Sequence, residues 1–200
     1  MKNIIRLPQA FEYLQNKEYV VFNTKTTGLG LTAEICEICV IDGKTGNTLL
    51  NTLVKPVNPI QEGARRSHGI TEQMVEDAQS WGVVSKAVRR AAAGKLGVAY
   101  NAQFNIDMLV QSSNAMGEIV DPLFNFKGYF CAMQEYSKRA KSYHHVRTDT
   151  NRLKLRQACE YEEIDTPEIL HRAYAVANLT HHLVQKILMK NEQEAQQYDA

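Results

Sequence analysis

Residues Tyr19 to Gly28 read YVVFNTKTTG, and this stretch decides the fold that we expect. Its first four residues are aromatic or β-branched, which predicts a buried strand. The Thr26-Thr27-Gly28 sequence that follows is typical of a loop that a ligand can approach closely, because glycine has no side chain in the way. The stretch therefore predicts a central strand that delivers side chains and a loop to a binding site.

The segments on either side of this strand predict further strands with helices around them. Two strands, Glu34 to Ile41 and Thr48 to Val54, are joined by a turn-rich segment and should pair antiparallel. The later pattern predicts a helix capped by Thr71, helices at Trp81 to Ala93, Asn101 to Val110, Leu153 to Glu160 and Pro167 to Lys190, and short strands at Lys95 to Tyr100 and Gly128 to Cys131. This order of elements favours an α/β domain with a mixed central sheet.

Length and composition predict one globular domain over residues 1–200, with a helical extension over residues 1–18 and a polar tail over residues 190–200 whose end frays. Apolar residues make up 44% and charged residues 22%, which is ordinary for a globular protein. The formal charge of +1 means that any surface for nucleic acid has to come from local clusters of Lys and Arg. Without a membrane-spanning run or a secretory signal, we expect a cytoplasmic protein with no membrane partner.

The stretch YVVFNTKTTG resembles the first motif of the DnaQ-like 3′-5′ exonucleases, the DEDDh group of the ribonuclease H-like superfamily, in which the strand ends Phe-Asp-Thr-Glu-Thr-Thr-Gly. Later segments are similar to further motifs of that family in the correct order: Ile35 to Ile38, His68 to Thr71, Tyr100 to Asn105 and His171 to Ala177. The resemblance extends from Tyr19 to about Leu188. It implies a ribonuclease H-like α/β fold, with five strands in the order 3-2-1-4-5 and helices on both faces.

The resemblance also implies where the catalytic groups of the family would lie. Those enzymes hold two Mg or Mn ions between carboxylates, and a histidine of the third motif is the general base. At the matching positions this sequence has Asn23, Lys25, Asn105 and Val176 in place of the four acids, and it retains the histidine as His171. Because Mg binds to clusters of anionic oxygens, this set should hold no metal. The sequence thus predicts an inactive homologue without a metal cofactor.

A binding function remains open to such a site. We expect Lys25 to replace the metals and contact the phosphate of a single-stranded DNA or RNA 3′ end, with Asn23 and Asn105 donating amide hydrogens. The other predicted nucleic-acid-binding residues come from the resemblance and from the basic stretch Lys138 to Arg156. This stretch contains seven cations and one acid. Besides Lys25 the set contains Thr26, Thr27, Gly28, His68, Asn101, Phe104, Arg139, Lys141, Arg147 and Arg152.

Several alternatives stay open. The chain could be an active metal-dependent 3′-5′ exonuclease with a divergent site, or a regulatory module that acts through a protein partner or as a homodimer. An alternative origin of Asn23 and Lys25 is random sequence drift in a site that is no longer under selection. An alternative for His171 is a purely structural role. Deliberate removal of the acids by mutation fits less well, since the replacements include a valine and a lysine.

Other residues that could carry chemistry favour structural roles. Cys36 and Cys39 lie three apart in a strand and therefore point to opposite faces, which predicts reduced core thiols rather than a zinc site. Asp107 follows Asn105 by two helical positions and points away from it, so we expect a surface residue. Neighbouring histidines on a helix do not face one another. We therefore expect surface or partly packed histidines at positions 144, 145, 181 and 182. Core or loop packing is expected for Trp81, Phe124, Phe126 and Tyr129.

Overall fold

The structure is a computed structural model, and it describes residues 11–118, 124–143, 152–166, 168 and 170–198. A five-stranded sheet in the order β3-β2-β1-β4-β5 lies at its centre. β1 pairs antiparallel with β2 and parallel with β4, and β3 continues the antiparallel side. The strands are β1 (Tyr19–Thr26), β2 (Ile35–Asp42), β3 (Thr48–Leu53), β4 (Leu96–Ala99) and β5 (Tyr129–Cys131). The predicted mixed sheet and its strand order are confirmed.

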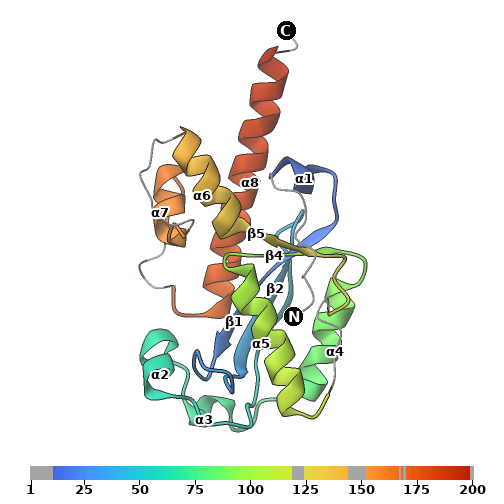
Figure 1. Cartoon of the computed structure of the whole chain (residues 1–200), viewed down its shortest axis with the longest axis vertical. Coiled ribbons are helices and arrows are strands. Elements are labelled where there is room, and N and C mark those ends of the chain that lie inside the picture. Colours follow the sequence, from blue (N-terminus) through green and yellow to red (C-terminus); the bar gives the residue numbers. More distant parts are fainter. Residues whose placement is uncertain (1–10, 119–123, 144–151, 167, 169, 199–200) are drawn as a thin grey trace.

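Helices cover both faces of this sheet, with α4 and α5 on one face and α8 on the other (Figure 1). The helices of the described residues are α1 (Glu12–Gln15), α2 (Glu62–His68), α3 (Glu72–Val75), α4 (Trp81–Ala92), α5 (Ala102–Ala115), α6 (Ala132–Tyr143), α7 (Leu155–Tyr161) and α8 (Ala173–Tyr198). None of them is both long and apolar enough to cross a bilayer.

The alternation of side chains along β1 assigns its residues to two different faces. Val20 is buried against α4 and α5. Val21 is buried on the other side, in a cluster that contains residues of α6, α7 and α8. Because side chains alternate along a strand, Thr24 falls on the α5 side, and Asn23 and Lys25 fall on the α8 side. β1 therefore presents polar groups to both faces of the sheet at its carboxyl end.

Two helices, α2 and α6, are not predicted by the sequence pattern. α2 has seven residues and contains Gly63, which lowers helix propensity. α6 buries Ala132, Tyr136 and Ala140 at intervals of four residues. Two of these are small alanines, so the apolar stripe is weak in the sequence although the packing is clear in the structure. The other predicted strands and helices are present with shifted ends.

The helix α8 begins and ends later than the sequence predicts. The predicted start at Pro167 lies outside the described residues, and the helix begins at Ala173, whose N–H donates to the carboxylate of Glu37 on β2 at 2.7 Å. This contact with another element gives no local sequence signal. At the other end the helix continues to Tyr198, because no Gly or Pro follows Lys190 there and hydrogen bonds link its side chains to α1. Most of the predicted polar tail is therefore helical, and Figure 1 shows this end of α8 projecting from the body. Positions 199 and 200, at the end of the tail, lie outside the described residues.

Candidate functional site

Asn105 is fully buried and links the start of α5 to β1. Its Oδ1 accepts the N–H of Thr24 at 2.8 Å and the hydroxyl of Thr24 at 2.9 Å. Its Nδ2 donates to the carbonyl of Asn101 at 3.0 Å. Asn101 itself is exposed, and its φ of 127° is rare for a residue other than glycine. The amide of Asn105 thus serves mainly to hold the start of α5 in place.

Asn23 and Lys25 lie on the opposite face of β1 and are half-buried. The Oδ1 atom of Asn23 is buried and has no hydrogen-bond partner among the described residues. The Lys25 ammonium likewise makes no hydrogen bond or ion pair within the described part of the chain. Burial lowers the pKa of Lys25, and the nearby charge of Glu37 opposes this effect. Both groups could therefore bind a ligand without breaking an internal contact.

Glu37 is a buried acid that lies opposite Lys25 in the β1–β2 pair. Its carboxylate accepts hydrogen bonds from Nε and Nη2 of Arg172 and from the N–H of Ala173. This hydrogen-bonded pair raises the pKa of Arg172. Because Glu37 is bonded to Arg172 and to the first N–H of α8, the Lys25 ammonium is left without a bonded counterion.

The loop Thr26–Gly28 is held in shape by its own polar groups. The hydroxyl of Thr26 donates to the carbonyl of Gly28 at 2.7 Å. The hydroxyl oxygen of Thr27 accepts the N–H of Glu34 at 3.0 Å, and the N–H of Thr27 donates to the carbonyl of Glu34 at 2.8 Å. Since both threonine side chains are buried, the structure places them as supports of the loop.

His68, at the end of α2, supports the same loop. Its Nε2 donates to the carbonyl of Thr26 at 3.0 Å, and its Nδ1 accepts the N–H of Ile70 at 3.1 Å. These partners fix a neutral ring, and burial lowers the pKa of His68. With both nitrogens bonded and the ring buried, His68 can act on a ligand through the position of the loop.

Two leucines directly after this loop are exposed to an unusual degree. Leu29 is 85% and Leu31 is 92% exposed. An exposed apolar patch beside polar groups can mark a binding surface, whereas single exposed apolar residues are common. Neither residue is in the predicted set, although the sequence Gly28-Leu29-Gly30-Leu31 offers a signal, because residues between glycines in a loop have few neighbours to pack against.

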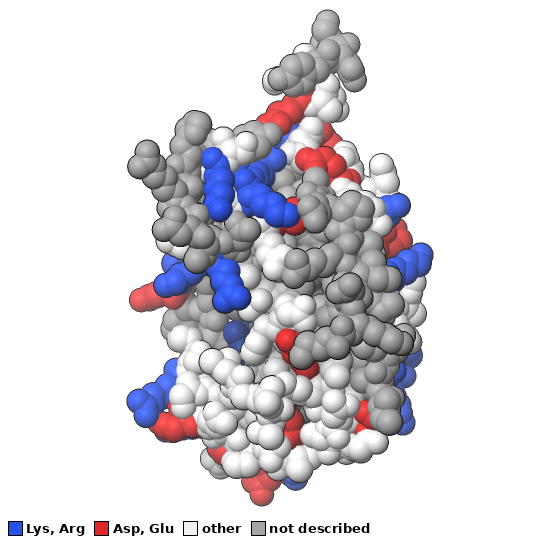
Figure 2. Space-filling view, in the orientation of Figure 1, with Lys and Arg blue, Asp and Glu red and all other residues white. Residues whose placement is uncertain are grey.

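The predicted basic residues gather around α6. Figure 2 shows Lys and Arg side chains over this helix. Lys138 pairs with Glu135 at 2.8 Å, and Arg139 donates to the side chain of Asn191 on α8 at 3.0 Å. Lys141 and Arg152 are exposed, and position 147 lies outside the described residues. On α6, Lys138 and Lys141 are therefore exposed and Arg139 is half-buried, and the helix lies apart from the carboxyl end of β1 (Figure 1).

Comparison with known proteins decides the family. The sequence model of RNase_T, described as Exonuclease, matches residues 20–180. This chain belongs to the DnaQ-like exonuclease family. An uncharacterized exonuclease of Escherichia phage 186 is 34% identical to it over 169 residues, which cover 80% of this chain and 83% of that protein.

Solved exonuclease structures share the fold of this DnaQ-like chain. The structure of Exonuclease X in complex with 5′ overhanging duplex DNA has a TM-score of 0.61 at 21% identity and covers 86% of this chain and 92% of that chain. The nuclease domain of 3′hExo, described as a DEDDh family member bound to rAMP, has a TM-score of 0.66 at 14% identity. The match covers 87% of this chain and 92% of that chain. The ribonuclease H-like arrangement expected from the resemblance is thus confirmed.

The groups at the positions that the resemblance assigns to the metal-binding acids do not fit the two divalent cations that it implies. Asn23 and Asn105 offer neutral amide oxygens, and the Asn105 oxygen already accepts two hydrogen bonds from Thr24. Lys25 adds a positive charge, and the half-buried side chain of Val176 packs against the apolar cluster on the α8 face. Mg and Mn require several anionic oxygens, which this donor set lacks. Across the described ranges, no three His, Cys, Asp or Glu side chains lie close enough together to hold a metal ion.

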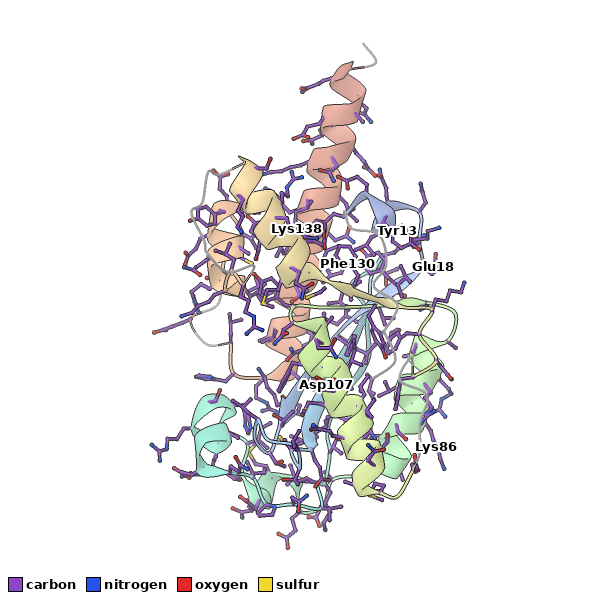
Figure 3. All side chains as sticks on the ribbon, viewed as in Figure 1. Tyr13, Glu18, Lys86, Asp107, Phe130 and Lys138 are labelled. Atoms are coloured by element: carbon purple, nitrogen blue, oxygen red, sulfur yellow. The ribbon has the colours of Figure 1, made fainter. Side chains whose placement is uncertain are left out.

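The remaining candidate residues lie around this site in different ways. His171 is exposed just before α8, and Phe104 is partly buried against the cluster that contains α4 and α5. Asp107, labelled in Figure 3, lies on α5, is exposed and accepts a hydrogen bond from Gln103 at 2.9 Å. Its predicted surface role is confirmed.

The residues expected to have packing roles also lie within the fold. Cys36 and Cys39 belong to different clusters, as expected for opposite faces of a strand. The aromatic residues that were expected to pack are buried in one cluster: Trp81, Phe124, Phe126 and Tyr129. His181 is buried and His182 is exposed, while positions 144 and 145 lie outside the described residues.

Sequence reasoning missed the contact between Glu37 and Arg172. Both residues lie within the quoted motifs, but the sequence does not reveal that they bond across 135 positions. It also missed Gln61, whose side chain lies against Gly28. The only sequence signal for Gln61 is its place just before α2, where a residue can contact the loop that precedes it in space.

Proposed function

We propose that this chain is a catalytically inactive DnaQ-like exonuclease homologue that binds the 3′ end of single-stranded DNA or RNA through Lys25. The observation that carries the proposal is the Lys25 ammonium, which has no bonding partner among the described residues. By the resemblance, Lys25 stands where the family has a metal-binding acid. A phosphate oxygen bound there would provide the counterion that Glu37 does not.

Asn23 supplies a second contact in this proposal. Its buried Oδ1 lacks a donor within the described structure, and it lies two residues before Lys25 on the same face of β1. A terminal 3′-hydroxyl can donate to that oxygen while Lys25 binds the adjacent phosphate. The two groups together favour an end that carries both a hydroxyl and a phosphodiester.

The surrounding residues would hold the rest of the strand. The exposed Leu29 and Leu31 offer apolar surface to unstacked bases, and Phe104 and Asn101 lie at the start of α5. The loop Thr26–Gly28, supported by His68, would receive the terminal nucleotide. Arg139, Lys141, Arg147 and Arg152 would follow the backbone further away. Related folds solved with duplex DNA and with rAMP support a nucleic-acid ligand.

A direct test compares wild type, Lys25→Glu and Lys86→Glu for binding of a 5′-labelled single strand with a 3′-hydroxyl, with and without Mg or Mn. Lys86 is exposed on α4, so its variant makes the same charge change away from the site. Lys25→Glu should weaken binding by at least about tenfold, because a charge-assisted hydrogen bond is replaced by repulsion. Lys86→Glu should bind like wild type, and equal affinity of wild type and Lys25→Glu would overturn the proposal.

The same samples separate the two alternatives. Shortening of the strand that a chelator abolishes would favour an active metal-dependent exonuclease with a divergent site, for which the retained His171 is the residue to examine next. Neither binding nor shortening would favour a regulatory module that acts through a protein partner or a homodimer.

A further inference from the structure

Arg172 is held at the start of α8 by the buried carboxylate of Glu37. Its Nε donates to Oε1 of Glu37 at 2.8 Å, and its Nη2 donates to the same oxygen. The other oxygen, Oε2, accepts the N–H of Ala173 at 2.7 Å. Glu37 therefore binds the first N–H of α8 directly, and the start of the helix does not require a bond from Arg172.

The outer edge of the Arg172 guanidinium remains open to a ligand. Its side chain is 47% exposed, whereas the side chain of Glu37 is 3% exposed. A guanidinium has five N–H donors. Two of them bind Glu37, and Nη1 makes no hydrogen bond with any described residue. The carboxylate thus fixes the direction of the guanidinium and leaves donors on its outer edge unused.

Lys25 lies beside the same carboxylate. Lys25 and Glu37 are directly opposite each other in the antiparallel pair of β1 and β2, and α8 packs against both strands (Figure 1). Both side chains fall on the α8 face, where such a pair has its Cβ atoms about 5 Å apart. The Lys25 ammonium makes no ion pair with Glu37 or with any other described acid. Two cations therefore lie on one face of the sheet, next to a carboxylate that is bonded to only one of them.

We infer that Arg172 and Lys25 together bind the last phosphodiester of the strand, each cation binding one of its two non-bridging oxygens. The inference rests on the proposed binding of strand ends and adds a second residue that holds the phosphate. The fork of an arginine and the point charge of a lysine both suit phosphate oxygens. Because both cations lie beside one carboxylate, they match the two oxygens of one phosphate better than two successive phosphates, which a nucleoside separates.

Two variants distinguish direct binding by Arg172 from simple neutralisation of Glu37. Arg172→Gln should weaken binding of a single strand about tenfold, because charge-assisted hydrogen bonds are lost. In that variant the charge of Glu37 is no longer neutralised, which by itself repels a phosphate. The double variant Glu37→Gln/Arg172→Gln keeps the net charge of wild type and leaves no lone acid. It should still bind at least about threefold more weakly than wild type.

A second pair of charges provides the matched control. Glu18 and Lys44 form an exposed ion pair at 2.8 Å, and Glu18 directly precedes β1, at the end of the strand away from Lys25. The double variant Glu18→Gln/Lys44→Gln makes the same change of charges there and should bind like wild type. Thermal unfolding checks that each variant is folded. Arg172→Lys, which keeps the charge beside Glu37 but lacks the fork, is a further variant and should lose about threefold in affinity.

Strands with one uncharged linkage identify the phosphate. A methylphosphonate replaces a charged oxygen with a methyl group, at the last linkage of one strand and at the preceding linkage of another. Low ionic strength keeps weak binding measurable. With the last linkage uncharged, wild type and the double variant at positions 37 and 172 should agree within about twofold. With the preceding linkage uncharged, the difference between them should remain.

The outcomes separate this inference from the proposed function. Binding that depends on Lys25 but is unchanged in the double variant at positions 37 and 172 would overturn the role of Arg172 and leave the binding of ends intact. A loss by the same factor on every strand would do the same, because it would be an effect through the fold. A loss that disappears only when the preceding linkage is uncharged would assign Arg172 to another phosphate and also overturn the inference. Absence of binding to all strands by wild type would overturn both.

Discussion

The two faces of β1 carry neighbouring polar residues that differ in how they are bonded. On the α5 side, Thr24 donates its N–H and its hydroxyl to the buried amide of Asn105. On the α8 side, Asn23 and Lys25 have polar atoms without a partner among the described residues. The hydrogen bonds between Thr24 and Asn105 stabilise the fold. The unpaired polar atoms of Asn23 and Lys25 have a free-energy cost in the unbound protein, which a ligand that pairs with them could remove. Stability and binding should therefore respond in opposite ways to changes on the two faces.

The largest effect on stability should come from the α5 face. Asn105→Ala removes the acceptor for two groups of Thr24 and the donor for the carbonyl of Asn101, all in a buried place. The free energy of unfolding should fall by about 2–4 kcal/mol, measured by urea denaturation. Asn114→Ala, at an exposed position of the same helix, is the control and should change it by less than about 0.5 kcal/mol. Equal effects of the two variants would mean that the link to Thr24 contributes nothing.

A smaller loss should follow from Glu37→Gln, which changes the bonded acid opposite Lys25 on the α8 side. The glutamine side chain has no charge to neutralise Arg172. Its NH2 group, which replaces one carboxylate oxygen, cannot accept a hydrogen bond. Because Arg172 is half exposed and water can replace part of the contact, we expect a loss of about 1–2 kcal/mol in unfolding free energy. Binding of a single strand should become tighter, since Arg172 is released as a second cation beside Lys25.

Glu194→Gln, at an exposed position of α8, serves as the control for that variant. It should change neither unfolding nor binding measurably. If Glu37→Gln weakened binding while the protein stayed folded, the carboxylate itself would be part of the ligand site, and Arg172 would not act as a second cation for the strand.

The sequence was sufficient for the fold because the strands carry strong local patterns. The run of β-forming residues in β1, the alternating pattern of β2 and the apolar run of β4 predicted the strands, and the resemblance supplied the strand order. The start of α8 was not predictable, since the carboxylate of Glu37 that caps it comes from a distant strand. The missed helix α6 contains small alanines whose burial depends on partners that the local sequence does not show.

The sequence could assign the candidate residues to their elements, but it could not predict the bonding among them. Asn23 and Lys25 lie on the predicted first strand and Asn105 lies on the predicted helix that follows β4. Only the structure shows that Asn105 is bonded to Thr24 while Lys25 lacks a partner in the described ranges. Hydrogen bonds between segments depend on side-chain direction at the level of single atoms, and the types of the residues are the same whether or not these bonds form.

A still smaller effect, of opposite sign, should come from Lys25→Met. Removal of a half-buried ammonium that lacks a bonded partner should raise the unfolding free energy by about 0.5–1 kcal/mol, while binding of a single strand is lost. The pKa of Lys25 is lowered in the folded protein from its usual value of 10.5. Between these two pKa values the unfolded chain binds more protons, so the stability of wild type should rise with pH up to about 10.5. This rise should be absent in Lys25→Met, and a destabilised variant would contradict the comparison.

His181 also has a buried polar atom without a hydrogen bond, but this atom does not mark a ligand site. Its Nε2 donates to the carbonyl of Gly43 at 3.0 Å, and its Nδ1 is buried with no partner among the described residues. Burial lowers the pKa of His181 from 6.5, with the neighbouring His182 adding to the effect and Asp42 opposing it. The atom lies in the fold between α8 and the turn after β2, so the expected consequence is a dependence of stability on pH rather than binding.

The sign of this last and smallest effect follows from the direction of the pKa shift. Below 6.5 the unfolded chain takes up a proton that the folded ring resists, so stability is lost as pH falls from 6.5 toward the folded pKa of His181. Urea denaturation of wild type and His181→Gln should show that the variant loses about 0.5 kcal/mol less between pH 7 and pH 5. His68 has the same direction of shift, so part of the acid sensitivity should remain. His182→Gln, at the exposed neighbouring position, should keep most of the wild-type dependence. Identical pH dependence in His181→Gln and wild type would show that the buried ring is not held in its neutral form.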